Sequence, residues 1–374
     1  MIKGGTMSTN LEVGIVGLPN VGKSTLFNAI TKAGAEAANY PFCTIEPNVG
    51  VVDVPDDRLP KLADMFNSKK IFPAAMRFVD IAGLVEGASK GEGLGNKFLS
   101  HIRQVDAIAQ VIRCFEDPNI THVAGSIDPI RDIEIINTEL CLADLDSVEK
   151  RKQRIEKIAK SGDKAARAEL PLLDRIIEAL GEAKPVRALG LDEDEMDMIK
   201  ELTLLTAKPS LFVCNISEDE VGDYSANELV KKVKAYAANE GSGIVVVSAR
   251  IESEIAELSD EEASAFLADL GVEESGLKKL IKAAYGLLGL INYFTAGPME
   301  TRAWTIVNGT KAPQAAGKIH SDIEKGFIRA EIVAFDDLMA CGSQNAAKEK
   351  GLVRLEGKDY VMKDGDVTHF RFNV

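Results

Sequence analysis

A glycine-containing segment near the start of the chain has the residue types that hold a polyphosphate. Residues 17–24 read Gly-Leu-Pro-Asn-Val-Gly-Lys-Ser, and they match the pattern G-x-x-x-x-G-K-[ST] at every fixed position. Glycines let successive backbone N–H groups point at one anion, and a helix that starts there adds its positive dipole end. The segment predicts a phosphate-binding loop; the alternative is a chance glycine turn before a helix.

The polar side chains of this loop have expected roles. Lys23 would place a cation at the β- and γ-phosphates and is a candidate catalytic residue, while Ser24 would bring its hydroxyl to Mg²⁺. Asn20 resembles the asparagine that coordinates K⁺ in cation-activated GTPases, which predicts stimulation by K⁺. The expected nucleotide contacts in the loop are Gly17, Asn20, Val21, Gly22, Lys23, Ser24 and Thr25.

Residues further along the chain complete the set that phosphoryl transfer needs. Thr44, in a loop bracketed by prolines, would be a second metal ligand beside Ser24. Asp80 ends an apolar strand, where a carboxylate would hold the metal through water, and Gly83 would offer its backbone N–H to the γ-phosphate. Many GTPases carry a glutamine directly after this glycine to orient the attacking water, but here the residue is Leu84. We therefore expect slow intrinsic hydrolysis.

His122 is the hypothesised replacement for the missing glutamine. It follows a strand and the break Asp117-Pro118-Asn119 inside the expected nucleotide domain, so it could swing toward the γ-phosphate as a catalytic residue. The alternative is an ordinary histidine in a surface loop.

Two later segments lie where the base of a nucleotide would be expected. Asn215-Ile216-Ser217-Glu218 and Ser248-Ala249-Arg250 each follow an apolar strand. In the N-K-x-D motif of P-loop GTPases the Asp accepts two hydrogen bonds from guanine, whereas here Glu218 is one methylene longer and Ile216 replaces the Lys. Asn215 can pair with adenine N6 and N7, and the Ile216 main chain could serve N1 or N6. The predicted base-site residues are Asn215, Ile216, Glu218 and Ser248. We expect ATP to be preferred over GTP, or at least accepted alongside it; the alternative is a guanine site that tolerates Glu.

The elements that would position these residues alternate between strands and helices. Apolar runs predict strands at residues 11–16, 49–54, 75–81, 107–115, 210–215 and 243–248. Helices are expected at residues 25–31, 226–238, 254–269 and 276–286. This alternation predicts an α/β fold with a doubly wound, mostly parallel sheet. We expect a mixed sheet, because P-loop GTPases usually have an antiparallel second strand.

The pattern changes twice along the chain, and the changes suggest domain boundaries. Residues 129–208 lack strand-like runs and have charged, helical periodicity, which predicts an inserted helical hairpin of coiled-coil type. From residue 291, alternating apolar and polar residues predict a compact α+β domain. We therefore expect a nucleotide-binding domain over residues 8–128 and 209–290, a helical domain over 129–208 and a C-terminal domain over 291–374.

Composition limits the class of protein. The chain has 374 residues, 45% hydrophobic content and a net charge of −14, which favours a multidomain globular protein and argues against coating nucleic acid with the whole surface. No apolar run approaches bilayer length and no signal-peptide core is present, so we expect a cytoplasmic protein without a membrane partner. The five cysteines are scattered, which argues against a zinc site or a disulfide framework.

Four motifs together resemble the Obg-like ATPase family, the YchF type of P-loop protein. They are G-L-P-N-V-G-K-S-T at residues 17–25, P-F-C-T-I-E-P-N at 41–48, D-I-A-G-L-V-E-G-A-S-K-G-E-G-L-G-N at 80–96 and N-I-S-E at 215–218. The resemblance implies an ATP-hydrolysing switch that associates with ribosomes. It also implies a coiled-coil insertion where residues 129–208 lie, and a C-terminal TGS domain of β-grasp fold over residues 291–374.

Other functions remain open at this point. The chain could be a nucleotide-gated module that docks on ribosomes or RNA, with hydrolysis incidental, and Leu84 favours that alternative. A small-molecule phosphotransferase would need a substrate domain that the sequence does not show. The basic stretch Lys150–Arg167 could meet ribosomal RNA phosphates, or it could be a solvated helix face with internal ion pairs. A monomer is expected.

Overall fold

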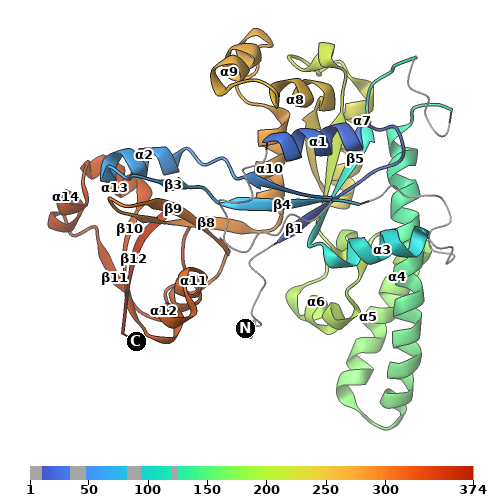
Figure 1. The fold of residues 1–374 in the computed structure, drawn as a ribbon. Coiled ribbons are helices and arrows are strands. Elements are labelled where there is room, and N and C mark those ends of the chain that lie inside the picture. Colours follow the sequence, from blue (N-terminus) through green and yellow to red (C-terminus); the bar gives the residue numbers. More distant parts are fainter. Residues whose placement is uncertain (1–10, 34–47, 82–93, 119–124, 374) are drawn as a thin grey trace. The chain divides into compact units, whose positions relative to one another are not determined.

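The structure is a computed structural model of the chain, and it describes residues 11–33, 48–81, 94–118 and 125–373 (Figure 1). The described chain divides into two compact units. The nucleotide unit contains residues 12–50 and 77–284, and the C-terminal unit contains residues 51–76 and 285–374 with Leu11. Each unit is described by itself.

A six-stranded sheet with the order β2-β4-β1-β5-β6-β7 carries the expected site. Its strands are β1 (Glu12–Val16), β2 (Val49–Asp53), β4 (Ala75–Asp80), β5 (Ala107–Arg113), β6 (Ser210–Asn215) and β7 (Gly243–Val247). β4, β1, β5, β6 and β7 pair in parallel. β2 runs the opposite way beside β4, because Asp80 N donates to Asn48 O while Val54 N donates to Ala74 O. The predicted mixed, mostly parallel sheet is confirmed.

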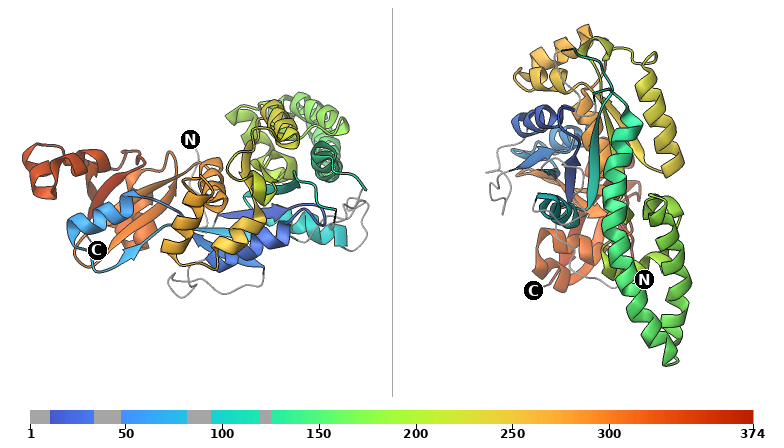
Figure 2. Two further views of the ribbon diagram at one scale, coloured as in Figure 1. Left: turned by 90° about the horizontal axis from the view of Figure 1, so that it is seen from above. Right: turned by 90° about the vertical axis from the view of Figure 1, so that its right-hand side faces the viewer.

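Helices cover both faces of this sheet (Figure 2, right). α4 and α7 pack on β5 and β6, where Ile133 and Val233 join a core cluster with Phe212. α1 lies on the other face. The α-helices of the nucleotide unit outside the insertion are α1 (Lys23–Ala33), α3 (Leu94–Gln104), α7 (Glu228–Glu240), α8 (Ala249–Ile255), α9 (Asp260–Asp269) and α10 (Gly276–Leu287).

The prediction of a single helix over residues 254–269 was wrong. α8 ends at Ile255, and a new helix, α9, begins after Ser259. Ser259 and Glu262 form a capping box, in which the Ser259 hydroxyl accepts from the Glu262 amide and the Glu262 carboxylate accepts from the Ser259 amide. This reciprocal cap satisfies backbone groups at a helix start, so the chain begins a second helix here.

Residues 129–208 form a helical insertion without a strand, as predicted. Its elements are α4 (Pro129–Lys160), α5 (Lys164–Gly181), η3 (Val186–Leu189), α6 (Glu193–Ile199), η4 (Lys200–Leu202) and η5 (Leu205–Ala207). The Asp128 side chain caps α4, and Pro129 occupies its first turn. Val148, Leu173 and Ile176 are fully buried in the core that joins the two long helices.

The C-terminal unit has its own sheet, in the order β11-β10-β12-β8-β9-β3. Its strands are β3 (Ile71–Phe72), β8 (Leu290–Ala296), β9 (Thr301–Val307), β10 (Phe327–Ala334), β11 (Arg354–Glu356) and β12 (Asp366–Phe372). Its helices are α2 (Arg58–Phe66), α11 (Ala312–Ile319), α12 (Ser321–Lys325), α13 (Phe335–Cys341) and α14 (Gln344–Glu349). Tyr293 and Phe370 meet edge to face in its core. The α+β character predicted for this end of the chain is confirmed.

Within the described residues, no helix combines the length and the apolar composition needed to cross a bilayer.

Candidate nucleotide-binding site

Glycines shape the loop between β1 and α1 at the points where it passes closest to other backbone and side-chain atoms. A Cβ on Gly17 would lie 2.9 Å from the carbonyl oxygen of Val111 on β5. Gly22 has a φ of +95°, and a Cβ there would clash with Nδ2 of Asn215. Asn20 also has a positive φ, of 63°, which asparagine tolerates better than most residues. The loop conformation therefore depends on glycine at the positions that the motif specifies.

Lys23 and Asp80 form an ion pair across the mouth of this loop. Lys23 is the first residue of α1, and Asp80 is the last residue of β4, which pairs with β1 through Ile15. Their side chains are 11% and 22% exposed. The pair brings a cation and a carboxylate to the same corner, where a polyphosphate and its counter-ion would meet.

Asn215 ties the phosphate loop to the segment after β7. Its Nδ2 donates to the Val21 carbonyl at 2.9 Å, and its Oδ1 accepts from the Ala249 amide at 2.9 Å. The residue is only 4% exposed. The next residue, Ile216, is also buried, and its amide donates to the Val247 carbonyl at 2.9 Å. The backbone donor of Ile216 is therefore engaged within the protein.

Glu218 carries an ionic partner that the sequence analysis missed. Its carboxylate lies 2.8 Å from Nε of Arg250, which is 71% exposed and also lies 3.5 Å from Glu254. Ser248, at the end of β7, is 3% exposed, and its hydroxyl has no hydrogen-bond partner among the described residues. The opposite charges of Glu218 and Arg250 were visible in the sequence, but nothing in their 32-residue separation indicates contact.

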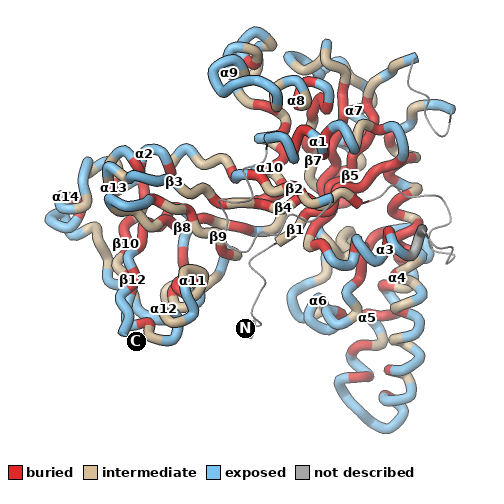
Figure 3. The backbone as a smooth tube through the Cα atoms, in the orientation of Figure 1, coloured by how far each residue is buried: buried red, intermediate tan, exposed pale blue. Residues whose placement is uncertain are grey.

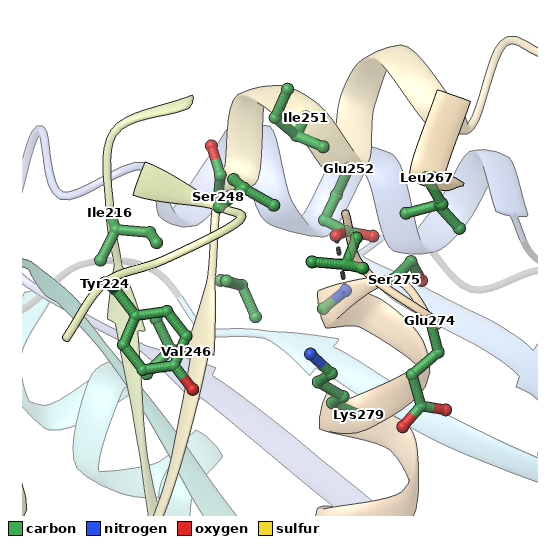
Figure 4. A pocket seen from close by; sticks show the side chains of 14 residues that line it. Ile216, Tyr224, Val246, Ser248, Ile251, Glu252, Leu267, Glu274, Ser275 and Lys279 are labelled. Carbon is green, nitrogen blue, oxygen red and sulfur yellow. Dashed lines mark hydrogen bonds between the residues drawn. The ribbon is translucent and has the colours of Figure 1, made fainter. Parts of the chain in front are cut away.

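A small pocket of about 20 Å³ adjoins this base side of the site (Figure 4). Ile216, Tyr224 and Ser248 line one part of it, and Glu252 and Lys279 line another. Glu252 is 3% exposed and accepts from the Gly276 amide at 2.7 Å. Burial raises the pKa of the Glu252 carboxyl above its ordinary value, although hydrogen bonds from Leu277, Gly276 and Ser275 oppose this.

Comparisons with known proteins agree with this arrangement. Residues 12–160 match the family MMR_HSR1, described as a 50S ribosome-binding GTPase, and residues 290–373 match YchF-GTPase_C, described as a protein of unknown function. A relative from Bacillus subtilis, called ribosome-binding ATPase YchF, is 63% identical over 97% of this chain and 100% of its own length. This chain belongs to the YchF family.

Two further YchF-family members show the same likeness over nearly the whole chain. The ribosome-binding ATPase YchF of Mycoplasma genitalium is 50% identical over 97% of this chain and 100% of its own length. The solved structure titled as the YchF GTPase of Schizosaccharomyces pombe has a TM-score of 0.89 and 42% identity, covering 99% of this chain and 100% of that one. The predicted family and fold class are thus confirmed.

The described part of this YchF-family site suits Mg²⁺. Ser24 is exposed in the first turn of α1, beside the Lys23–Asp80 pair, so a hydroxyl and a carboxylate oxygen are available to the hard cation. Among the described residues, no three His, Cys, Asp or Glu side chains gather as a protein-only metal cage. This fits a metal held mainly by phosphate and water oxygens, as Mg²⁺ usually is in such proteins.

Several expected site residues lie outside the described residues of this YchF-family chain. They are Thr44, Gly83 and His122, together with Leu84. The other expected residues lie at or just after the carboxyl ends of β1, β4, β6 and β7. They are Gly17, Asn20, Val21, Gly22, Lys23, Ser24, Thr25, Asp80, Asn215, Ile216, Glu218 and Ser248. That edge of a parallel sheet is where ligands bind in doubly wound folds.

Proposed function

We propose that this chain is a Mg²⁺-dependent P-loop ATPase whose bound nucleotide controls its association with ribosomes. The observation that carries the proposal is the Lys23–Asp80 pair at the mouth of the phosphate loop, in a chain 63% identical to a relative called ribosome-binding ATPase YchF. A cytoplasmic location follows, because ribosomes are found there.

The protein groups around the phosphates have separable tasks. The loop N–H groups and Lys23 would bind and orient the β- and γ-phosphates, and Ser24 and Thr44 would hold the metal, with Asp80 acting through water. Mg²⁺, when bound, neutralises charge on the phosphate oxygens. The Gly83 amide would sense the γ-phosphate, and His122 would orient the attacking water in place of a glutamine.

The base side favours adenine for two reasons. Arg250 pairs with the Glu218 carboxylate, which a guanine would need for its N1–H and 2-amino groups. The Asn215 side chain donates one N–H to the Val21 carbonyl and accepts one hydrogen bond from the Ala249 amide. Its second N–H can donate to adenine N7, and the second lone pair of its oxygen can accept from the N6 amino group. The Ile216 carbonyl is a second acceptor for the N6 amino group.

Competition binding tests the nucleotide assignment. ATP, GTP and their diphosphates would compete for a labelled ATP analogue on the purified protein with Mg²⁺, and ATP should bind more tightly than GTP. The Lys23→Ala variant should lose affinity for both ATP and GTP. This result would distinguish phosphate binding by the loop from selection of the base. Selective GTP binding would overturn the adenine assignment. Turnover should be faster in K⁺ than in Na⁺ if Asn20 holds a K⁺ ion.

A second candidate function is a ribosome-docking module in which hydrolysis is incidental. Leu84, in place of a polar residue after Gly83, favours this candidate. Turnover measured with and without ribosomes separates the two, since an enzyme working as a switch should be stimulated and a docking module should not.

We further propose a three-domain division of the chain and a monomeric state. The expected domains are 8–128 with 209–290, 129–208, and 291–374, but residues 51–76 and 285–290 belong to the C-terminal unit and are moved to the C-terminal domain. The strand-free helical insertion and the separate C-terminal sheet support this division.

A further inference from the structure

The basic stretch on the helical hairpin separates into two parts with different surroundings. In the part nearer the sheet, three successive cations each have an acidic partner. Lys150 lies 2.6 Å from Asp146, Arg151 lies 2.7 Å from Glu169, and Lys152 lies 2.6 Å from Asp174. These cations bind within the hairpin, so this part is a helix face with internal ion pairs.

The hairpin tip, defined here as residues 154–167, has a different balance. It contains five basic residues and two acidic ones in a chain of net charge −14. Arg154, Lys157, Lys160 and Lys164 are exposed, and none of them forms an ion pair with a described residue. Figure 3 shows that the chain at this end of the hairpin is mostly exposed. The two acids do not neutralise them.

Those two acids are engaged elsewhere. The Asp163 carboxylate accepts from the Ala166 amide as the N-cap of α5, at 2.8 Å. Glu156 lies 3.9 Å from Lys152 on the same helix. The tip therefore presents cations to solvent, while its two carboxylates are engaged in a helix cap and in an ion pair with Lys152.

Helix stability does not account for all of these cations. Lys157 and Lys160 are in the last turn of α4, where the negative end of the helix dipole favours them. Lys164, however, is the first residue of α5, where the positive dipole end disfavours a cation, and α5 has no acidic residue in its first turn. The helix dipole therefore accounts for Lys157 and Lys160 but not for Lys164.

We propose that the hairpin tip docks on the phosphate backbone of ribosomal RNA, an inference that rests on the proposed association with ribosomes. Lysine binds phosphates as a compact point charge without sequence preference, which suits an irregular RNA surface. The tip projects away from the sheet of the nucleotide unit, so its cations can reach a large partner (Figure 1). In a chain that is acidic as a whole, this basic end is a surface that RNA phosphates can approach without charge repulsion.

Co-sedimentation of the full chain with purified ribosomes over a series of KCl concentrations tests this inference. The test variant is Lys157→Glu/Lys160→Glu/Lys164→Glu. The matched control is Lys231→Glu/Lys232→Glu/Lys234→Glu, which makes the same charge change on the exposed side of α7. ATP affinity and thermal unfolding of each variant establish that it is folded, and a triple Lys→Gln tip variant provides a milder change.

The tip reversal should weaken ribosome binding by about tenfold or more and lower the salt slope by about two to three, because each lost phosphate contact removes roughly 0.7–0.9 from that slope. The Gln variant should fall between, the α7 control should stay near wild type, and isolated ribosomal RNA should displace the wild-type chain. Equal losses in tip and control variants, an unchanged salt slope, or no displacement by RNA would overturn the inference. If the wild-type chain itself fails to bind ribosomes, the proposed function fails with it.

Discussion

The side chain of Asn215 holds two parts of the nucleotide site together, since its Nδ2 donates to the Val21 carbonyl and its Oδ1 accepts from the Ala249 amide, both at 2.9 Å. Val21 belongs to the phosphate loop and Ala249 is the first residue of α8. The contact also explains Gly22, because any Cβ there would clash with the Asn215 amide. Phosphate side and base side are thus joined through one buried amide.

We predict that Asn215→Ala weakens ATP and GTP binding together and destabilises the nucleotide unit. The variant leaves the Val21 carbonyl and the Ala249 amide without their buried partner, which costs about 1–3 kcal/mol for each group left unsatisfied. Urea unfolding and ATP and GTP affinities would measure both effects.

Ser217→Ala is the control for Asn215→Ala, since it changes a neighbouring side chain that makes no cap hydrogen bond at the start of η6 (Glu218–Glu220). A loss of ATP affinity alone, with GTP affinity and stability unchanged, would show that Asn215 acts only on the base.

Local chemistry was predictable from the sequence, whereas contacts between distant segments were not. The phosphate loop was recognisable because its glycines, Lys23 and Ser24 have a fixed spacing on adjacent residues. The Asn215–Val21 bond joins residues 194 positions apart, and no local pattern indicates it. The role expected for Asn215 was contact with adenine, and the structure adds bracing of the loop.

The segment after β2 shows the same limit. The sequence analysis assigned no element to residues 55–74, and α2 forms there as part of the C-terminal unit. Arg58 on α2 is held by Asp56 and by Asp364, which is 306 residues away, and its guanidinium stacks on Phe294. Such a pairing depends on the tertiary fold, so periodicity alone cannot show it.

Arg250→Gln should shift base selectivity toward GTP. Without the guanidinium, the Glu218 carboxylate becomes available to the N1–H and 2-amino groups of guanine. Because this ion pair is exposed, it is worth at most about 1 kcal/mol, so the ratio of GTP to ATP affinity should rise by up to about fivefold. Glu254→Gln, which removes the other acid near Arg250, should leave the ratio unchanged. An identical ratio in Arg250→Gln and wild type would contradict the role given to this pair.

The buried carboxyl of Glu252 should make stability depend on pH in a direction opposite to that of a salt-bridged acid. Burial is the largest cause that raises its pKa above 4.5, so the folded state holds the proton more tightly than the unfolded state. The stabilisation that the protonated Glu252 carboxyl contributes is fully present below pH 4.5, and it is lost as the pH rises through the pKa that Glu252 has in the folded state. Glu252→Gln keeps an oxygen to accept from Gly276 and removes this slope. Urea unfolding at pH 5 and pH 8 should show that the free energy of unfolding of Glu252→Gln, relative to wild type, is higher at pH 8 than at pH 5.

Glu254→Gln is the comparison for the pH experiment, because Glu254 lies on the same helix with a side chain 51% exposed. Its profile should run parallel to that of wild type. A difference between Glu252→Gln and wild type that stays constant from pH 5 to pH 8 would show that Glu252 titrates normally.

A largely buried ion pair between Arg187 on η3 and Glu240 on α7 joins the helical insertion to the rest of the nucleotide unit. Nε of Arg187 donates to Glu240 at 2.6 Å, and Asn137 on α4 accepts from Arg187 at 2.9 Å while donating to Glu240 at 3.2 Å. The Arg187 and Glu240 side chains are 10% and 5% exposed. Three elements from different parts of the chain therefore share one polar network.

Glu240→Leu alone should destabilise the chain by about 3–5 kcal/mol, because it leaves the Arg187 cation buried without its partner. Arg187→Met/Glu240→Leu should recover most of that loss, since removing both charges also removes their desolvation penalty. Urea unfolding of wild type, Arg187→Met, Glu240→Leu and the double variant completes a double-mutant cycle for this pair. A double variant as unstable as the sum of the single variants would mean that the two residues act independently, and the insertion would then be held mainly by the apolar packing of α4 against α7.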